Sequence, residues 1–372
     1  MVGCLYIQDW SSELIKKIID YQNSFVSFFN PQNGLYIRTG IINDKGCDTG
    51  EDPFMAFFPQ LVDIGIMGHC VHGTSELCLQ SGVQCYQSGS VINEPNMLLT
   101  DFKEIIDQCK YKTFQVALGG RGDPDQHESF KEIVSYCAGN EVVPNFTTSG
   151  FSMTDKSAAL CREYCGAVAV SWYRQKHTTA AIKKLLNADV KTNIHYVLDK
   201  NSVEEAIWLL KNRAFPEGIN AVVFLLHKPV GLGEEENQLK IEDPFTSEFF
   251  SLTEQSGYPF RLGFDSCTIP AFIEYNLAID HCFVDTCEGA RFSCYITPDL
   301  KMVPCSFDQH QRWVYDLTRN SIAKGWYSQQ FEDFRDRLSS SCPDCSERDK
   351  CMGGCPIKPD IVLCSKLKKN KK

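Results

Sequence analysis

The sequence predicts an α/β fold in two parts, a parallel sheet with covering helices and a cysteine-rich C-terminal region. Between residues 61 and 226, apolar runs of β type alternate with amphipathic stretches of helical period. The runs are apolar on both faces, which is typical of parallel strands covered by helices. From about Tyr258 the alternation stops, and ten of the 19 cysteines lie beyond that residue.

The expected elements follow one another as strand, helix and strand. Strands are expected at residues 61–67, 113–118, 142–145, 167–172, 191–198 and 221–226. Helices are expected between them at residues 97–109, 130–137, 155–164, 178–186 and 202–211. Parallel strands joined in this way have right-handed crossovers. We therefore divide the chain into a lead-in segment at 1–60, a sheet domain at 61–257 and a cysteine-rich domain at 258–372.

Composition excludes several classes of protein. The chain of 372 residues carries a net charge of −10, which argues against a nucleic-acid-binding surface. It has no apolar run of the roughly 20 residues that cross a bilayer and no N-terminal signal peptide, so no membrane partner is expected. Free thiols in this number indicate a reducing compartment, and we expect a cytoplasmic protein. The basic end, residues 366–372, has the composition of a solvated tail.

The cysteines near the C-terminus indicate a metal centre. Cys342, Cys345, Cys351 and Cys355 are spaced C-x2-C-x5-C-x3-C, and Cys364 follows. Two thiolates separated by two residues can bind one metal centre, and five thiolates exceed the needs of one tetrahedral zinc ion. An odd number of cysteines in a chain of this length argues against a disulfide scaffold. Structural zinc stays the alternative, and iron–sulfur ligation is the favoured interpretation.

Together with Cys287 and Cys305, this run resembles the SPASM extension of radical S-adenosylmethionine (SAM) enzymes. Twelve residues separate Cys287 from Leu300, which stands where the family has a turn glycine, and four more precede Cys305. The side chain of Asp299 can support that turn. The resemblance implies two auxiliary 4Fe–4S clusters. The outer one would take Cys342, Cys345, Cys351 and Cys364, and the inner one Cys287, Cys305 and Cys355 with Cys282 or Cys267. We expect Cys294 to be a strand residue.

The expected strands and helices resemble the partial (β/α)6 barrel of radical SAM enzymes, an eight-stranded TIM barrel cut short. In such barrels the sites gather at the carboxyl ends of the strands. The family's C-x3-C-x2-C motif is absent, and Cys70, Cys78 and Cys85 stand in its place with the spacing C-x7-C-x6-C. They are the predicted ligands of the SAM-binding cluster. The alternatives are ordinary buried thiols, or a zinc site that includes His69 or His72.

Two further strand ends resemble the SAM-binding positions of the family. The turn G-G-R-G-D-P after the second strand supplies the predicted contacts Gly119, Gly120 and Asp123, the last as partner of the methionine ammonium group. Other predicted SAM contacts are Ser171 for the ribose, Arg174 for the methionine carboxylate and Tyr86 for the adenine, which could also shield the cluster. Thr147 and Thr148 follow the third strand, where family members also contact the cofactor.

The resemblance implies an enzyme that modifies a ribosomally made peptide. The segments D-I-G-I-M-G-H-C and C-P-I-K-P-D-I-V-L-C are similar to those of spliceases, which excise a tyramine equivalent and leave an α-keto-β-amino acid. A maturase that forms thioether or carbon–carbon crosslinks is the alternative, and an iron–sulfur electron carrier without SAM chemistry is the alternative from another class. Expected partners are a precursor peptide, a separate small leader-peptide-binding protein, and an electron donor such as flavodoxin or ferredoxin.

Overall fold

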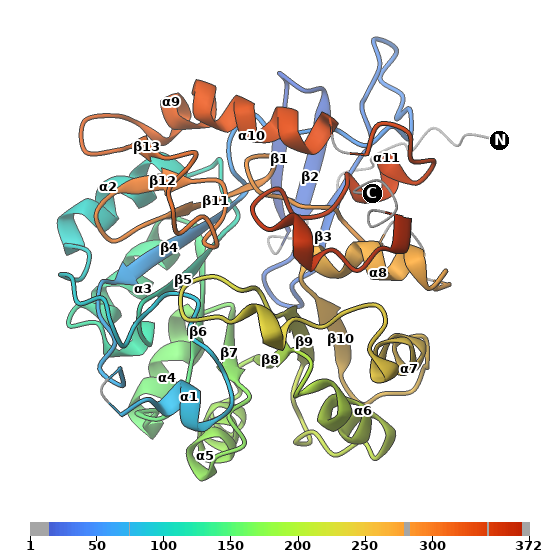
Figure 1. Cartoon of the computed structure of the whole chain (residues 1–372). Helices are drawn as coiled ribbons and strands as arrows, with labels where there is room; N and C mark the ends of the chain where they lie inside the picture. Colours follow the sequence, from blue (N-terminus) through green and yellow to red (C-terminus); the bar gives the residue numbers. More distant parts are fainter. Residues whose placement is uncertain (1–14, 74, 279–282, 341, 367–372) are drawn as a thin grey trace.

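The structure, a computed structural model, describes residues 15–73, 75–278, 283–340 and 342–366 (Figure 1). Its main sheet contains β4 (Leu61–Met67), β5 (Gln115–Gly120), β6 (Val143–Thr148), β7 (Ala167–Ser171), β8 (Thr192–Leu198), β9 (Ala221–Leu226), β10 (Arg261–Phe264), β11 (Ser293–Ile296), β12 (Lys301–Val303) and β13 (Tyr315–Asp316). The strand order is β10-β9-β8-β7-β6-β5-β4-β11-β12-β13. Neighbours from β10 to β11 are parallel, whereas β11, β12 and β13 are antiparallel.

The helices described are α1 (Leu77–Gln80), α2 (Leu99–Cys109), α3 (Phe130–Gly139), α4 (Asp155–Tyr164), α5 (Lys176–Asn187), α6 (Val203–Lys211), α7 (Pro244–Thr253), α8 (Ile269–Glu274), α9 (Ile322–Trp326), α10 (Gln329–Ser340) and α11 (Arg348–Cys351). Each of the six predicted strands and five predicted helices is present, and every end lies within three residues of its predicted place. The predicted α/β fold is therefore confirmed. Among the helices described, none combines the length and apolar character needed to cross a membrane.

Alternation of side chains along each strand separates the two faces of the sheet. In β4, Val62, Ile64 and Ile66 are fully buried in the core that the sheet shares with its covering helices. The residues between them face the inside of the curved sheet, where Asp63 is the charged member. Burial raises the pKa of the Asp63 carboxyl to about 7. The strands are thus apolar toward the helices and partly polar toward the lumen.

Local sequence explains where the helices begin. Helix α4 starts after Thr154, whose hydroxyl accepts a hydrogen bond from the Ser157 backbone, while the Ser157 side chain accepts one from the Thr154 backbone. This reciprocal capping satisfies two backbone donors that the helix itself leaves free. Helix α7 starts with Pro244 in its first turn, where a missing N–H costs nothing.

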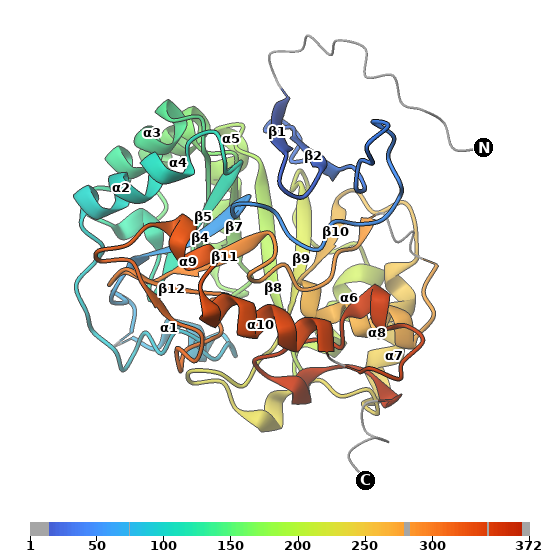
Figure 2. The ribbon, with the colours of Figure 1, turned by 90° about the horizontal axis from the view of Figure 1, so that it is seen from above.

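The structure adds two features to the predicted organisation. The lead-in region contains a separate three-stranded antiparallel sheet of β1 (Lys16–Asp20), β2 (Phe25–Phe29) and β3 (Tyr36–Arg38). Strand β10 lies beyond the expected end of the alternation, and it extends the parallel sheet by pairing with β9. Figure 2 shows β1 and β2 on one side of the main sheet, and α8 and α10 on the other.

The C-terminal domain is joined to the barrel through the main sheet. Strand β11 pairs in parallel with β4, and Cys294 lies in β11 with 1% of its surface exposed. Cys294 is therefore the strand residue that the sequence predicts. Beyond β13, helix α10 packs Phe331, Phe334 and Leu338 into the core, and the chain then continues through the short helix α11.

Candidate functional site

The loop that follows β4 carries Cys70, Cys78 and Cys85, and its fold makes these three thiols neighbours. Burial raises the pKa of the Cys78 thiol to about 12, and the charges of Cys85 and Cys70 add to that rise. Burial also raises the pKa of the Cys70 thiol, with a contribution from Cys85. A metal that binds such thiols must displace their protons. The structure therefore brings the three predicted cysteines together at the carboxyl end of β4.

The glycine-rich turn after β5 packs against this cysteine loop. Gly120 has a φ of +115°, and a Cβ atom there would meet the Met67 carbonyl oxygen at 2.4 Å. A Cβ atom on Gly122 would meet the His69 carbonyl oxygen at 2.7 Å. Only glycine allows the two backbones to approach so closely. At Gly119, by contrast, no atom lies within 4 Å of a Cβ position, so this residue leaves open space beside the strand end.

Asp123 lies between hydrogen-bond donors and the cysteine loop. Its carboxylate accepts hydrogen bonds from the Ser149 backbone N–H, at 2.8 Å, and from the Ser149 hydroxyl. His72 Nε2 lies 3.4 Å from Asp123 Oδ2. After burial, the charge of Asp123 is one of the causes that raise the pKa of Cys70 and Cys78. A carboxylate held in this way, close to the thiols, can pair with an ammonium group.

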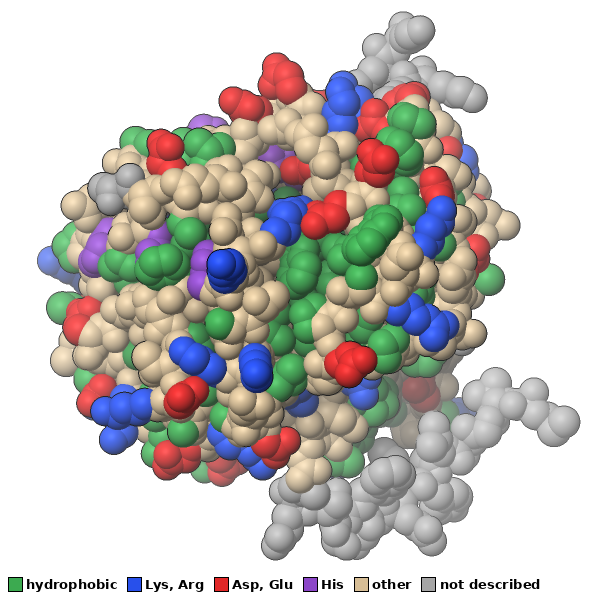
Figure 3. Space-filling view, turned by 90° about the horizontal axis from the view of Figure 1, so that it is seen from below, with side chains coloured by type: hydrophobic (Ala, Val, Ile, Leu, Met, Phe, Trp, Pro, Cys, Tyr) green, Lys and Arg blue, Asp and Glu red, His purple; other side chains and the backbone are tan. Residues whose placement is uncertain are grey.

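Several buried polar atoms near Asp123 have no hydrogen-bond partner among the described residues. They include His177 Nε2 and Asp125 Oδ1. The Phe151 ring connects the two histidines, with centroid distances of 4.8 Å to His72 and 5.3 Å to His177. Figure 3 shows histidine side chains gathered on the left of the face seen from below. Buried polar atoms without partners mark a place where a bound ligand supplies them. The strand ends therefore fit a polar cofactor such as SAM.

The other predicted SAM contacts at strand ends have partners inside the protein. Ser171 ends β7, and its side chain is within hydrogen-bonding reach of the Tyr173 hydroxyl, which lies 3.0 Å from Cys78 Sγ. Arg174 donates to Glu205 Oε2, at 2.6 Å, and to the Ser81 carbonyl oxygen, at 3.0 Å. In this arrangement Arg174 fixes the cysteine loop to α6. Its contact with the methionine carboxylate stays a prediction.

The third strand end presents hydroxyl groups. Thr147 Oγ1 lies 3.2 Å from His195 Nδ1, inside the barrel. Thr148 Oγ1 accepts a hydrogen bond from the Gly150 backbone N–H, at 3.0 Å, and so shapes the turn after β6. Thr147 faces the lumen, and Thr148 supports the loop that carries Ser149.

A second group of thiols lies where the barrel meets the C-terminal domain. Cys267 and Cys355 are hydrogen-bonded to each other. Burial raises the pKa of the Cys287 thiol to about 12, with a contribution from Cys267. Burial also raises the pKa of Cys305, followed by the charge of Cys287. The inner set predicted from Cys287, Cys305 and Cys355 therefore lies together and includes Cys267. The other predicted candidate, Cys282, lies outside the described residues.

The third group is formed by the C-terminal cysteines. Burial raises the pKa of the Cys351 thiol, and the charges of Cys342, Cys345 and Cys364 add to it. Burial likewise raises the pKa of Cys342, with contributions from Cys345 and Cys364. These four thiols are the predicted outer set. They lie on α11 and the adjoining turns, and α11 contacts α8.

The turn between Cys287 and Cys305 has Leu300 where the family pattern has a glycine, and Leu300 adopts a backbone conformation that suits glycine. Leu300 has a φ of +61°, the left-handed conformation that glycine adopts most easily. Asp299 supports the turn through its carboxylate, which accepts a hydrogen bond from the Thr297 hydroxyl. Leucine pays roughly 1–2 kcal/mol for this backbone conformation. Leu300 also packs against the hydrophobic core, which offsets part of that cost.

Each of the three cysteine groups supplies at least three thiolates, as the ligand set of an iron–sulfur cluster requires. Among the described residues, no three His, Cys, Asp or Glu side chains converge closely enough to bind one ion. A tetrahedral zinc site draws all of its ligands onto a single atom. In a four-iron cluster each thiolate binds a different iron, so the sulfur atoms are spread around a larger body.

Tyr86 lies between the first and second cysteine groups. Its ring contacts the Phe307 ring, with a centroid distance of 4.5 Å. The Phe307 ring also contacts Lys228, whose Nζ lies 4.2 Å from the centre of the ring. Lys228 Nζ forms a buried ion pair of 2.6 Å with Asp265 Oδ2. Tyr86 follows Cys85 in the chain, and Phe307 lies two residues after Cys305. The position favours the shielding role predicted for Tyr86, and contact with an adenine ring stays a prediction.

Sequence reasoning missed several residues of this region. Tyr173 and His177 lie between β7 and the first turn of α5, and Ser149 follows β6; a lone histidine, tyrosine or serine carries no motif. Lys228 lies two residues after the end of β9, and this position near a strand end is the signal that the sequence offers. His72 was considered only as a zinc ligand, although it lies two residues after Cys70 and faces Asp123.

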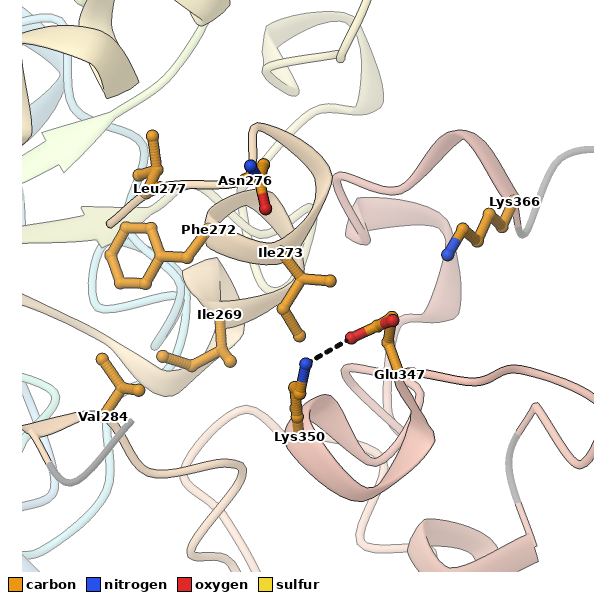
Figure 4. Close-up of a pocket in the computed structure, with 9 residues that line it drawn as sticks. All are labelled: Ile269, Phe272, Ile273, Asn276, Leu277, Val284, Glu347, Lys350 and Lys366. Atoms are coloured by element: carbon orange, nitrogen blue, oxygen red, sulfur yellow. Dashed lines mark hydrogen bonds and ion pairs between the residues drawn. The ribbon is translucent and has the colours of Figure 1, made fainter. Parts of the chain in front are cut away.

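A cavity of about 220 Å³ lies between α8 and the outer cysteine group. Ile269, Phe272 and Ile273 from α8 form its apolar side (Figure 4). Lys350 and Glu347, which form an ion pair of 2.7 Å, lie opposite. The cavity is apolar on the side of the barrel and charged on the side of the outer cysteines.

Comparison with known proteins agrees with this arrangement. Residues 287–351 match the SPASM family, described as an iron-sulfur cluster-binding domain. The crystal structure of Streptococcus suis SuiB bound to S-adenosylmethionine has a TM-score of 0.67 and 13% identity, over 95% of this chain and 98% of that one. SuiB bound to the precursor peptide SuiA has a TM-score of 0.67 and 12% identity, and the match again covers 95% of this chain and 98% of that one.

A second similar structure is native anSMEcpe with bound AdoMet. It has a TM-score of 0.57 and 17% identity, and the match covers 82% of this chain and 93% of that one. No curated protein matches the chain in sequence. At these identities the solved structures establish the fold. The SPASM match, over residues 287–351, lies within the predicted cysteine-rich region.

Proposed function

We propose that this chain, which carries a SPASM iron–sulfur cluster-binding domain, is a radical SAM enzyme that modifies a ribosomally made peptide. The observation that carries the proposal is the grouping of eleven described cysteines into three separate sets, one at the end of β4 and two in the C-terminal domain. The shared fold with SuiB and anSMEcpe, both solved with the cofactor, supports it.

In this proposal Cys70, Cys78 and Cys85 hold the SAM-binding 4Fe–4S cluster. When bound, that cluster and SAM supply a 5′-deoxyadenosyl radical, which abstracts a hydrogen atom from the substrate. Asp123 holds the ammonium group of the cofactor, since its carboxylate is fixed by Ser149 and faces the thiols. Gly119 leaves the space for the cofactor, and Gly120 lets the turn approach the cysteine loop.

Enclosure is the second contribution of the protein. Tyr173 covers Cys78, and the Tyr86–Phe307 contact closes the space between the first and second cysteine groups. Aromatic side chains in these positions exclude water from the reacting groups. Cys267, Cys287, Cys305 and Cys355 hold the inner auxiliary cluster, and Cys342, Cys345, Cys351 and Cys364 hold the outer one. Clusters held by these residues would supply a site that accepts the electron of the product radical or binds the substrate.

The peptide reaction that we propose is that of a splicease, excision of a tyramine equivalent to leave an α-keto-β-amino acid. The support is the similarity of the β4 loop and of the cysteine-rich tail to splicease sequences. SuiB has been solved with its precursor peptide, which supports a peptide substrate for a chain of the same fold. We further propose a separate leader-peptide-binding protein, a flavodoxin or ferredoxin as electron donor, and a cytoplasmic location.

The proposal is tested with anaerobically reconstituted protein and a candidate precursor peptide. We expect about 12 iron atoms in each chain, three clusters of four, and formation of 5′-deoxyadenosine with dithionite. Mass spectrometry of a coexpressed precursor should show the loss of a tyramine equivalent, whereas the loss of two hydrogens would indicate crosslinking instead. Iron without 5′-deoxyadenosine would favour an electron-transfer protein, and zinc in place of iron would contradict the proposal.

A further inference from the structure

A large cavity occupies the end of the barrel opposite to the cysteine loop. It has a volume of about 450 Å³ and is lined at the amino-terminal ends of the strands by residues such as Gln115, Lys191 and Arg261. Small-molecule sites in proteins typically have volumes of roughly 300–1,000 Å³. We propose that this cavity binds a small organic anion that carries a carboxylate or phosphate group.

The charges around the cavity all have one sign. Its ionisable lining residues are Lys191, Arg261 and His195, and no Asp or Glu lines it. The whole chain contains 47 acidic and 37 basic residues, so this lining runs against the overall composition. Burial and then the charge of Arg261 lower the pKa of Lys191, which shows that the two cations repel each other. Neither Lys191 nor Arg261 forms an ion pair with another of the described residues. An anion in the cavity would relieve this repulsion.

Neutral hydrogen-bond donors complete the lining. The Asn145 amide donates to Gln115 Oε1, at 2.9 Å, and the Asn220 amide donates to Asn193 Oδ1, at 2.7 Å. All four of these residues line the cavity, and in each pair the accepting residue keeps its NH₂ group as a donor while the donating residue keeps its oxygen atom as an acceptor. Burial lowers the pKa of His195 to about 4, so this imidazole is neutral. The cavity therefore offers two cations and the NH₂ groups of Gln115 and Asn193 at the same end of the barrel.

The loop between β2 and β3 covers the mouth and favours a small ligand over a peptide. Lys191 Nζ donates to the Pro31 carbonyl oxygen, and Arg261 Nη1 donates to the Asn33 carbonyl oxygen, both at 3.0 Å. Carbonyl oxygens satisfy some of the donors but do not neutralise the charges. Phe29 and Pro31 line the cavity beside these contacts. A peptide would have to displace this loop, whereas a small anion fits beneath it.

Equilibrium binding to the full chain tests the inference. Inorganic phosphate and citrate are titrated by calorimetry in a buffer that contains neither, together with tetraglutamate as an acidic peptide. We expect saturable binding of phosphate or citrate, and the better of the two identifies the anionic group. Lys191→Met with Arg261→Met should weaken that binding at least about tenfold, because both cationic partners are lost. Lys183→Met, an exposed lysine on α5, is the matched control and should leave binding unchanged.

A second variant guards against a folding defect in the double mutant. Gln115→Met keeps both cations and the loop contacts but removes an amide donor, and we expect binding several-fold weaker with an unchanged circular dichroism spectrum. The inference is overturned if neither anion binds saturably, or if the double mutant and Gln115→Met both bind as the parent does. It is also overturned if Lys183→Met weakens binding as much, or if tetraglutamate binds more tightly than both anions. None of these measurements depends on SAM chemistry.

Discussion

The barrel and the C-terminal domain hold their cysteine groups in different ways. In the barrel, β4 to β9 and their helices bury a continuous apolar core, and Cys70, Cys78 and Cys85 lie on a loop outside it. In the C-terminal domain, the outer cysteines lie on turns and the four-residue helix α11, beside buried apolar residues such as Ile361 and Leu363. From this difference we expect the barrel to fold without iron, and the outer turns to depend more strongly on metal binding for their structure.

The largest effect should come from removing the barrel cysteines. Cys70→Ala, Cys78→Ala and Cys85→Ala together should abolish SAM cleavage and remove about a third of the iron, since one of three proposed clusters is lost. The thermal unfolding midpoint should change little, because these thiols are outside the apolar core. Iron analysis, 5′-deoxyadenosine formation and circular dichroism are the measurements. Persistent cleavage would show that the cofactor cluster lies elsewhere.

Removing outer cysteines should give the opposite pattern. Cys342→Ala with Cys345→Ala should abolish peptide modification and leave SAM binding and basal 5′-deoxyadenosine formation largely in place. The C-terminal domain should lose structure, which limited proteolysis after residue 340 would detect. Cys47→Ala is the control, since this thiol lies in the lead-in region, far along the chain from each cysteine group. A well-folded double mutant that modifies its peptide at the normal rate would limit the outer cluster to a structural role.

These two regions also differ in what the sequence could predict. Long apolar runs identified β4 to β9, because a strand buried on both faces has a distinctive composition. Strand β10 is four residues with an exposed Arg261, and the strands of the lead-in sheet are short and mixed, so neither gave a clear pattern. The cysteine spacing predicts the outer set, and the structure places these four thiols near one another. The inner set combines residues more than 80 positions apart, and spacing alone could not choose between Cys267 and Cys282.

The residues at the boundary were least accessible to sequence reasoning. The Lys228–Asp265 ion pair is buried, with side-chain exposures of 3% and 18%. Its two members are 37 residues apart and belong to no motif. The two residues form an ion pair because β9 and β10 are neighbours in the sheet, so that the residues after each strand lie close together.

The Lys228–Asp265 pair provides the third prediction, at the junction of the two regions. Lys228→Met should lower the free energy of unfolding by about 3 kcal/mol, because it leaves the Asp265 carboxylate buried without its cation. Lys211→Met is the matched control: its ion pair with Glu248 is exposed and should contribute less than about 1 kcal/mol. Denaturant unfolding measures both. Equal effects in the two variants would mean that the buried pair does not stabilise the junction.

A smaller and more local effect is expected from the cofactor contact at Asp123. Asp123→Ala removes the proposed partner of the ammonium group, and loss of one member of a desolvated charged pair costs roughly 2–5 kcal/mol. SAM affinity should therefore fall at least about tenfold, with the iron content unchanged. Glu104→Ala, an exposed carboxylate on α2, is the control. Unchanged affinity by calorimetry would limit Asp123 to its hydrogen bonds with Ser149.

The smallest effect should be that of Ser171→Ala. The Ser171 hydroxyl is neutral, and a neutral hydrogen bond contributes only about 0.5–1.5 kcal/mol, so SAM affinity should fall by no more than about tenfold. Ser171 also reaches the Tyr173 hydroxyl, which touches Cys78, so part of the change could come from the cysteine loop. Tyr173→Phe separates the two causes: it should alter the absorption spectrum of the cluster while it leaves the Ser171 hydroxyl in place. If Ser171→Ala weakens SAM binding as strongly as Asp123→Ala, then binding does not depend mainly on the charged contact, and the hydroxyl at the end of β7 is an equal partner.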